Sequence, residues 1–284
     1  MESLLVVIKD DADGSDEQRV RAAIDALRAQ ADVQVARLAM PGDLDGALHR
    51  RGGRTVVVIG DDDHLHTVVS ALHRRNELDE TLVALLPDGS SKDFATGVGI
   101  PPDPVEAAHA LLHGTERRFD LLIDCRGSVA VNAVQLERRR ARTGDDLETA
   151  QAGRRSLLPD LARPLHVRVQ ADDHVLVDFD RPVLQVTVAN VLPPRRSASP
   201  PAADPADGYA DVLVCFAPSL LVRARRLLGR ETDAHDRPVK VRARRVSVAG
   251  QRFSMRTDGV ASGSERRCTW QVAPGRLRML VPKS

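Results

Sequence analysis

The first 120 residues alternate between short apolar runs and amphipathic segments of helical period, and this alternation limits the fold more than any other feature. Buried strands are predicted at Leu4–Ile8, Thr55–Ile59 and Thr81–Leu86, with a more exposed strand at Val33–Leu38. Helices are predicted at Asp16–Ala29, Gly42–Arg51, His66–Arg75 and Val105–His113. Strands that alternate with helices indicate a parallel sheet covered on both faces.

After Phe119 the pattern changes to many strands with few helices between them. Strands are predicted at Asp120–Cys125, Ser128–Gln135, His166–Val169, His174–Phe179, Leu184–Ala189, Ala210–Phe216, Lys240–Ala249 and Gln251–Arg256. Pro218–Leu228 is predicted to be a helix, and Pro193–Gly208 an exposed loop. This spacing is typical of an antiparallel sandwich or barrel. We therefore predict an α/β domain over residues 1–120 and a β-rich sandwich domain over residues 121–284.

Charge divides the chain at the same place. Residues 1–120 hold 13 Lys and Arg against 22 Asp and Glu, whereas residues 121–284 hold 28 against 18, so the net charges are −9 and +10. Arginine clusters lie at Arg138–Arg140, Arg195–Arg196, Arg223–Arg226 and Arg242–Arg245. Each cluster alone is an ordinary solvated surface, but together they would attract an anionic membrane, at about 1 kcal/mol per basic residue. Aromatic residues make up only 2% of the chain, so nucleic acid is not expected as a partner.

The cysteines and the start of the chain bear on its compartment. Cys125, Cys215 and Cys268 lie far apart in the sequence and form no C-x-x-C pair, so we expect reduced thiols. The first residues lack a basic signal-peptide segment, and the apolar runs are only strand-sized. We expect a cytoplasmic protein with at most peripheral contact at the inner face of the membrane.

The most informative segment is Val56–His66, where a buried strand runs into three consecutive aspartates, Asp61–Asp63. A strand that turns sharply into a helix presents backbone amides to a phosphate. The aspartates themselves fit either a solvated acidic turn or a Mg²⁺ site. A zinc site is not expected, because His64 and His66 are two residues apart and would not face each other on a helix.

This turn resembles the diacylglycerol kinase catalytic family, in which the strand is followed by Gly-Gly-Asp-Gly-Thr-Leu-Asn. The residues that match are Gly60, Asp62 and Leu65. The departures are Asp61 and Asp63 for glycines, His64 for threonine and His66 for asparagine.

Two further segments carry the resemblance over nearly the whole chain. Pro87–Ala95 followed by Gly99–Pro101 is similar to the family's Pro-x-Gly-Thr-x-Asn-Asp-Phe-Ala and Gly-Ile-Pro, with Lys92 in place of asparagine. Thr257–Val260 resembles its Asp-Gly-Glu element, and Ala273–Pro282 resembles its closing strand. Weaker similarities lie at Val131–Ala133, Val188–Asn190 and Asp207–Val212.

The resemblance implies a Rossmann-like nucleotide-binding domain of the NAD kinase and diacylglycerol kinase type, followed by the β-rich domain. It implies ATP and Mg²⁺ between the domains, and transfer of the γ-phosphate to a hydroxyl of a membrane lipid. It also implies that the last strand, at about residues 274–284, returns to the first domain. The catalytic carboxylate would be Asp258 and the metal ligand Asp62. The nucleotide would be held by Gly60, Asp61, Asp62, Asp63, His64, Gly89, Ser90 and Lys92.

Four departures fall on the positions that the chemistry needs. Asp61 and Asp63 place side chains where glycines let the backbone approach phosphate. Two like charges 4 Å apart repel by roughly 4 kcal/mol at an effective dielectric constant near 20. Val260 replaces the glutamate base and cannot accept a proton. The segment Lys9–Gly14 is acidic where the family has Asn-Pro and Ser-Gly, and the glycine triplet expected after Asn190 is absent.

Two functions therefore remain open from the sequence. One is an ATP-dependent lipid kinase in which Lys92 contacts phosphate; the other is a non-catalytic pseudokinase that binds lipid or a protein partner, with Lys92 merely solvated. A relative of the nicotinamide-nucleotide kinases is a weaker third reading, because Asp93–Ala95 and the closing strand favour the lipid branch. A homodimer is left open.

Overall fold

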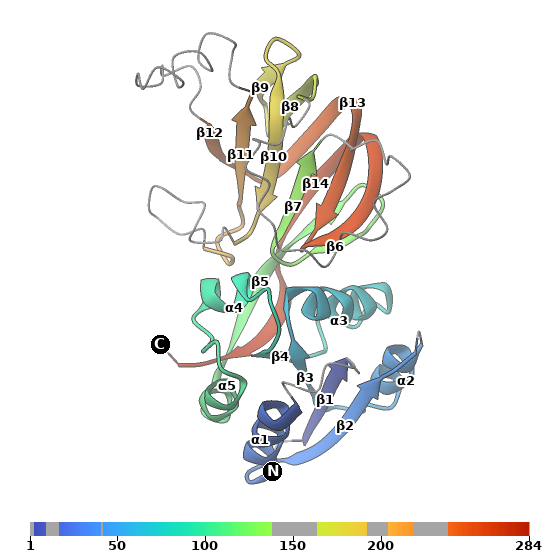
Figure 1. Ribbon diagram of the computed structural model, residues 1–284, viewed down its shortest axis with the longest axis vertical. Helices are drawn as coiled ribbons and strands as arrows, with labels where there is room; N and C mark the ends of the chain where they lie inside the picture. Colours follow the sequence, from blue (N-terminus) through green and yellow to red (C-terminus); the bar gives the residue numbers. More distant parts are fainter. Residues whose placement is uncertain are drawn as a thin grey trace, which may run out of the picture.

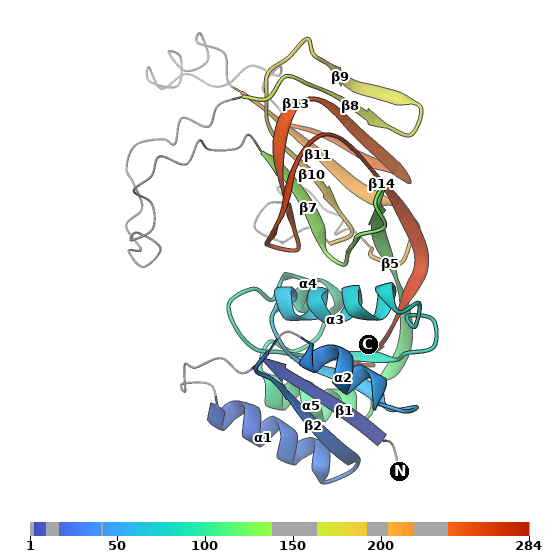
Figure 2. The same ribbon diagram turned by 90° about the vertical axis from the view of Figure 1, so that its right-hand side faces the viewer.

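The computed structural model describes residues 3–9, 17–40, 42–137, 164–191, 204–217 and 238–283. These residues form two lobes stacked along the long axis of the molecule (Figure 1). The lower lobe holds helices on both sides of a sheet, and the upper lobe is built almost entirely of strands, as the turned view also shows (Figure 2).

The first lobe is the predicted α/β domain. Its elements are β1 (Ser3–Lys9), α1 (Glu17–Arg28), β2 (Asp32–Leu38), α2 (Asp43–His49), β3 (Thr55–Gly60), α3 (Asp62–Arg74), β4 (Val83–Pro87), α4 (Asp93–Val98) and α5 (Pro104–Leu111). The strands pair in parallel in the order β2-β1-β3-β4. Helix α1 packs against α5, and α2 packs against α3. Strands β1, β3 and β4 are buried along most of their lengths because helices cover both faces.

The second lobe is antiparallel. Its strands are β5 (Thr115–Asp124), β6 (Val129–Ala130), β7 (Ala133–Glu137), β8 (Val167–Ala171), β9 (His174–Asp178), β10 (Val183–Ala189), β11 (Ala210–Phe216), β12 (Val239–Ala243), β13 (Arg245–Thr257) and β14 (Val260–Val281). The order β12-β11-β10-β7-β13-β14 continues into the parallel strands through β14, and β8 and β9 branch from β13. The predicted fold class, an α/β domain followed by a β-rich domain, is confirmed.

Two long strands join the lobes. Strand β5 leads the chain upward, and β14 pairs with it antiparallel from Trp270 opposite Asp124 to Val281 opposite Thr115. At its lower end β14 also pairs in parallel with β4, through Met279 and Leu280. The buried apolar residues form two clusters, one mainly in each lobe, and neighbouring residues of β5 belong to different clusters: Leu121 to the first and Leu122 to the second.

Several element boundaries differ from those predicted. Helix α3 begins at Asp62 rather than His66, because Asp61 caps it: its carboxylate accepts a hydrogen bond from the His64 amide. Helix α4 was not predicted, and β14 begins 13 residues before Ala273. The predicted break in the strand at Gly250 is a bulge within β13. The predicted helix Pro218–Leu228 and most of the loop Pro193–Gly208 lie outside the described residues.

Among the described residues, no helix combines the length and the apolar character needed to cross a bilayer.

Candidate functional site

A small cavity of about 90 Å³ lies where the two lobes meet, at the start of α3. It is lined by Asp62, Ser91, Asp93, Asn132, Ala133, Gln135, Thr187, Leu213, Asp258 and Gly259. Two of the predicted site residues, Asp62 and Asp258, therefore come together although they lie in different lobes.

Asp62 ties the start of α3 to the loop before α4. Its carboxylate accepts hydrogen bonds from the Ser91 hydroxyl at 2.8 Å, the Asp93 amide at 3.0 Å and the Phe94 amide at 3.3 Å. The residue is 3% exposed, and this burial outweighs the three donors and raises the pKa of Asp62 to about 6. Both oxygens are thus engaged within the protein.

Asp258 holds the turn between β6 and β7. Its oxygens accept hydrogen bonds from the backbone amides of Val131, Asn132 and Ala133, each at 2.8 Å. The side chain is fully buried, and the residue adopts the left-handed conformation with φ of 50°. Its predicted role as the catalytic carboxylate stays a prediction, but the group is already the acceptor for three buried amides.

His66 joins the two lobes through the same carboxylate. Its Nδ1 lies 2.9 Å from Oδ2 of Asp258, and its Nε2 lies 3.4 Å from the Ser70 hydroxyl one helical turn later. This contact links α3 to the β13–β14 turn, 192 residues away in the chain. Reasoning from sequence missed it, because the two residues that contact each other carry no shared local signal.

The glycine turn after β3 is filled by its own side chains. A Cβ added to Gly60 would lie 2.6 Å from Nδ1 and 2.8 Å from Cβ of His64, so the imidazole occupies the space that Gly60 leaves open. His64 is buried and donates from Nδ1 to the Ile59 carbonyl at 3.0 Å. Burial lowers the pKa of His64 below its usual range. A neutral imidazole therefore stands over the turn at pH 7.

A side chain also lies against the second glycine of the site, Gly89. Gly89 follows β4 with φ of 101°, and a Cβ added there would lie 3.2 Å from Cβ of Asp61. The Asp61 carboxylate accepts from the His64 amide, and the Asp62 amide donates to the Ser91 carbonyl at 3.1 Å. These two amides at the start of α3 are thus already bonded within the protein.

The remaining predicted nucleotide ligands are spread apart. Asp63 is partly exposed, and its carboxylate lies 3.4 Å from Nζ of Lys9. The Lys92 ammonium donates to the Pro102 carbonyl at 2.7 Å, and Ser90 is exposed. The structure therefore does not gather these residues around one point.

This arrangement does not fit the phosphates of a bound nucleotide. The positions beside Gly60 and Gly89, where backbone would meet phosphate, hold the side chains of His64 and Asp61. Among the residues that the structure describes, no group of three or more His, Cys, Asp or Glu side chains is placed to hold a metal ion.

The weaker family-like segments meet at the junction of the lobes, a cluster that sequence reasoning did not single out. Buried Asp120 accepts from the amides of Gly208 at 2.6 Å and Gly275 at 2.8 Å, and burial raises its pKa. The Asn190 side chain donates to the carbonyls of Asp120 and Val131. These bonds fix the point where β5 and β14 pass between the lobes.

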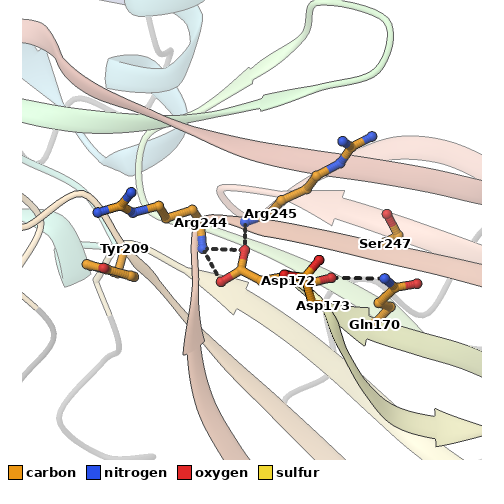
Figure 3. A pocket seen from close by; sticks show the side chains of 7 residues that line it. All are labelled: Gln170, Asp172, Asp173, Tyr209, Arg244, Arg245 and Ser247. Atoms are coloured by element: carbon orange, nitrogen blue, oxygen red, sulfur yellow. Dashed lines mark hydrogen bonds between the residues drawn. The ribbon is translucent and has the colours of Figure 1, made fainter.

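One arginine cluster lies in the described part of the second lobe. Arg242 pairs with Asp207, and the guanidinium groups of Arg242 and Arg244 lie over the Tyr209 ring at 5.0 and 4.8 Å. Arg244 and Arg245 line an open groove, but their guanidinium groups point in different directions (Figure 3). Asp172 and Asp173 line the same groove, so its two arginines are matched by two carboxylates (Figure 3). The clusters at Arg138–Arg140, Arg195–Arg196 and Arg223–Arg226 lie outside the described residues.

Comparison with known proteins finds similarity to one protein family. Residues 3–123 match the model of the diacylglycerol kinase catalytic domain. The chain is 29% identical to a Pseudomonas aeruginosa protein named "Probable lipid kinase YegS-like", over 99% of this chain and 95% of that protein. A Stenotrophomonas maltophilia protein of the same name is 39% identical over 80 residues, which cover 27% of this chain and 26% of that protein.

Solved structures share the fold. The chain superimposes on a diacylglycerol kinase from Bacillus anthracis strain Sterne with a TM-score of 0.70 at 19% identity, covering 99% of this chain and 96% of that one. A second structure from that strain, described as "a putative diacylglycerol kinase", gives a TM-score of 0.78 at 18% identity, with the same coverage. At these identities the likeness concerns the fold alone.

Proposed function

Because this chain belongs to the diacylglycerol kinase catalytic-domain family, we propose that it is a non-catalytic member that binds an anionic membrane surface. In this proposal it has lost the transfer of phosphate from ATP to a lipid hydroxyl. The observation that carries the proposal is the closed glycine turn. His64 fills the space beside Gly60, and Asp61 covers Gly89.

Two further features support the loss of phosphoryl transfer. Val260, at the position of the family's glutamate, is 37% exposed and has no group that could take a proton. Asp258, the nearest carboxylate in the chain, already accepts hydrogen bonds from three backbone amides and contacts His66. A general base needs a free lone pair within reach of the proton that it removes.

The charge of the second domain supports membrane binding. Residues 121–284 carry a net charge of +10 against −9 for residues 1–120. The open groove beside Arg244 and Arg245 also holds Asp172 and Asp173, so the attraction would come from the net charge of the whole domain and not from this groove. A domain of that net charge attracts anionic headgroups by summed charge and needs no specific contact.

An active lipid kinase is the second candidate, with ATP as the nucleotide that the family implies. Two observations favour it. The similarity to proteins named as probable lipid kinases runs over 99% of the chain, and the cavity between the lobes keeps Asp62, Asp93 and Asp258 in its wall. Several carboxylates beside a phosphate site would need Mg²⁺ to offset their charge.

Thermal unfolding with ATP or ADP, each with and without Mg²⁺, separates the two candidates. A nucleotide that binds only the folded protein must raise the melting temperature once its concentration exceeds the dissociation constant. We expect no shift at millimolar nucleotide for the natural protein. We expect a Mg²⁺-dependent shift in the triple variant Asp61→Gly, Asp63→Gly, His64→Thr, which reopens the turn. A shift in the natural protein would overturn the proposal, and lipid phosphorylation would then be measured.

Vesicle flotation tests the binding half of the proposal. We expect the protein to float with vesicles that contain phosphatidylglycerol at low salt and to be released from them at high salt. It should not bind neutral phosphatidylcholine vesicles. Failure to float with anionic vesicles at low salt would rule out the membrane role and direct the search to a protein partner.

A further inference from the structure

Two of the three cysteines meet in space although 143 positions separate them in the chain. The Sγ atoms of Cys125 and Cys268 lie 3.8 Å apart, and neither cysteine is part of a disulfide. Cys125 is exposed in the turn after β5, and Cys268 is buried on β14. A disulfide holds its two sulfurs at about 2.05 Å, so oxidation requires the two side chains to move closer together.

The pair lies next to the upper end of the pairing between β5 and β14, the two strands that connect the lobes. The β5–β14 pairing ends toward the second lobe at Asp124 opposite Trp270. Both cysteines lie just beyond this pair. Cys125 also lines an open groove of about 580 Å³ with Arg245 and Arg276. A small oxidant therefore has direct access to the Cys125 sulfur.

We propose that Cys125 and Cys268 are a reversible oxidation site, in which hydrogen peroxide converts the two thiols to a disulfide that fastens β5 to β14. This site goes beyond the proposed function and does not depend on it. The sulfur of Cys125, as its thiolate, attacks one peroxide oxygen. The S–O bond forms, the O–O bond breaks, and the leaving hydroxide takes up a proton as water.

The second step closes the disulfide. The sulfur of Cys268 attacks the sulfenic sulfur of Cys125, the S–O bond breaks, and hydroxide leaves as water with the Cys268 proton. Two thiols are oxidised and one peroxide is reduced to two waters. The order of the steps follows from exposure: burial and the neighbouring Cys125 raise the pKa of Cys268 to about 12, so the exposed thiol meets the oxidant.

Peptide mapping of the natural protein gives the direct test. The protein is treated with a slight excess of hydrogen peroxide, the remaining thiols are alkylated, and the digest is analysed without reduction. We expect a cross-linked peptide pair containing Cys125 and Cys268, a loss of two of the three thiols that can be alkylated, and full recovery with dithiothreitol. A digest in which Cys125 is oxidised to the sulfinic acid without the cross-link would overturn the proposal.

Three single variants sharpen the result. Cys215→Ser serves as the matched control and should leave the cross-link unchanged. Cys268→Ser removes the resolving thiol, so Cys125 should accumulate as a sulfenic acid that a dimedone probe captures. In Cys125→Ser the remaining thiols should stay free at the same peroxide dose. A cross-link that needs Cys215, or dimers in place of the internal bond, would refute the site. The mapping uses the natural protein, so the test stands even if Cys268→Ser folds poorly.

Discussion

Two neighbouring regions of this protein differ in how they use the family's pattern. At the junction of the lobes, the family-matching carboxylates of Asp62 and Asp258 are buried and accept several hydrogen bonds each. At the turn after β3, the departing residues Asp61, Asp63 and His64 occupy the space around the glycines or reach solvent. The two regions adjoin, since Asp62 lies within the turn itself.

The difference distinguishes residues that are needed to satisfy buried groups of the fold from residues that are needed only for contact with phosphate. Removing a carboxylate that satisfies buried amides destabilises any protein with this fold, whether or not it is an enzyme. A glycine turn that only leaves room for phosphate satisfies no buried group of the fold. The residues beside its glycines can therefore be replaced without loss of the fold. The matching carboxylates Asp62 and Asp258 therefore satisfy buried groups of the fold, whereas the departing residues Asp61 and His64 lie beside Gly89 and Gly60.

The largest expected effect comes from removing the junction carboxylate. Asp258→Ala leaves three buried backbone amides without an acceptor, and each such group costs about 1–3 kcal/mol. We expect the free energy of unfolding to fall by about 4 kcal/mol or more. Urea unfolding followed by the fluorescence of Trp270, which is buried on β14 and is the single tryptophan, measures this loss.

Asp178→Ala is the matched control, because that carboxylate is 56% exposed and pairs with Arg168 on the surface. Its loss should cost less than about 1 kcal/mol. Equal losses in the two variants would mean that the Asp258 carboxylate does not stabilise the junction of the lobes.

The second prediction concerns the pH dependence of stability at Asp62. Its folded pKa is about 6 against an ordinary value of 3.8, so the folded protein binds more protons than the unfolded chain between these values. The contribution of Asp62 to stability is therefore full below about pH 4 and is lost as the pH rises through 6. The loss should amount to about 2–3 kcal/mol.

Asp62→Asn should remove that slope, and the difference between its stability curve and that of the natural protein is the quantity to measure. Asp120, whose pKa is also raised, adds a slope of the same sign, and His64 adds one of opposite sign, but both remain in the two proteins. Asp25→Asn, at an exposed position on α1, controls for the change of charge. Parallel curves for the natural protein and Asp62→Asn between pH 4 and pH 7 would contradict the prediction.

Much of the fold was predictable from sequence because its signals are local. The four apolar residues on one face of the predicted helix Asp16–Ala29, namely Val20, Ala23, Ile24 and Leu27, are the buried residues of α1. The continuous apolar runs at Thr55–Ile59 and Thr81–Leu86 lie in the buried strands β3 and β4. Period and composition decide such elements over a few residues.

The site was less predictable because its contacts are long-range. The sequence identified Asp62 and Asp258 through a family resemblance, yet it gave no sign that Asp258 would contact His66. The start of α3 was placed four residues late, because three aspartates after a glycine suggest a loop, whereas Asp61 serves as a helix cap. The space beside Gly60 is filled because the His64 side chain points toward it, and no local sequence pattern predicts that direction.

The smallest effect tests the turn itself and is the sharpest test of the comparison. Gly60 is not among the glycines with positive φ, and the three atoms nearest to an added methyl group all belong to His64. Gly60→Ala should therefore lower the free energy of unfolding by about 2 kcal/mol through overpacking. In a His64→Ala background the same change should cost less than about 1 kcal/mol, because the clash is gone. A double-mutant cycle measured by urea unfolding and circular dichroism gives the coupling. An equal cost in both backgrounds would mean that Gly60 serves something other than the imidazole, and the turn would again be a candidate for phosphate.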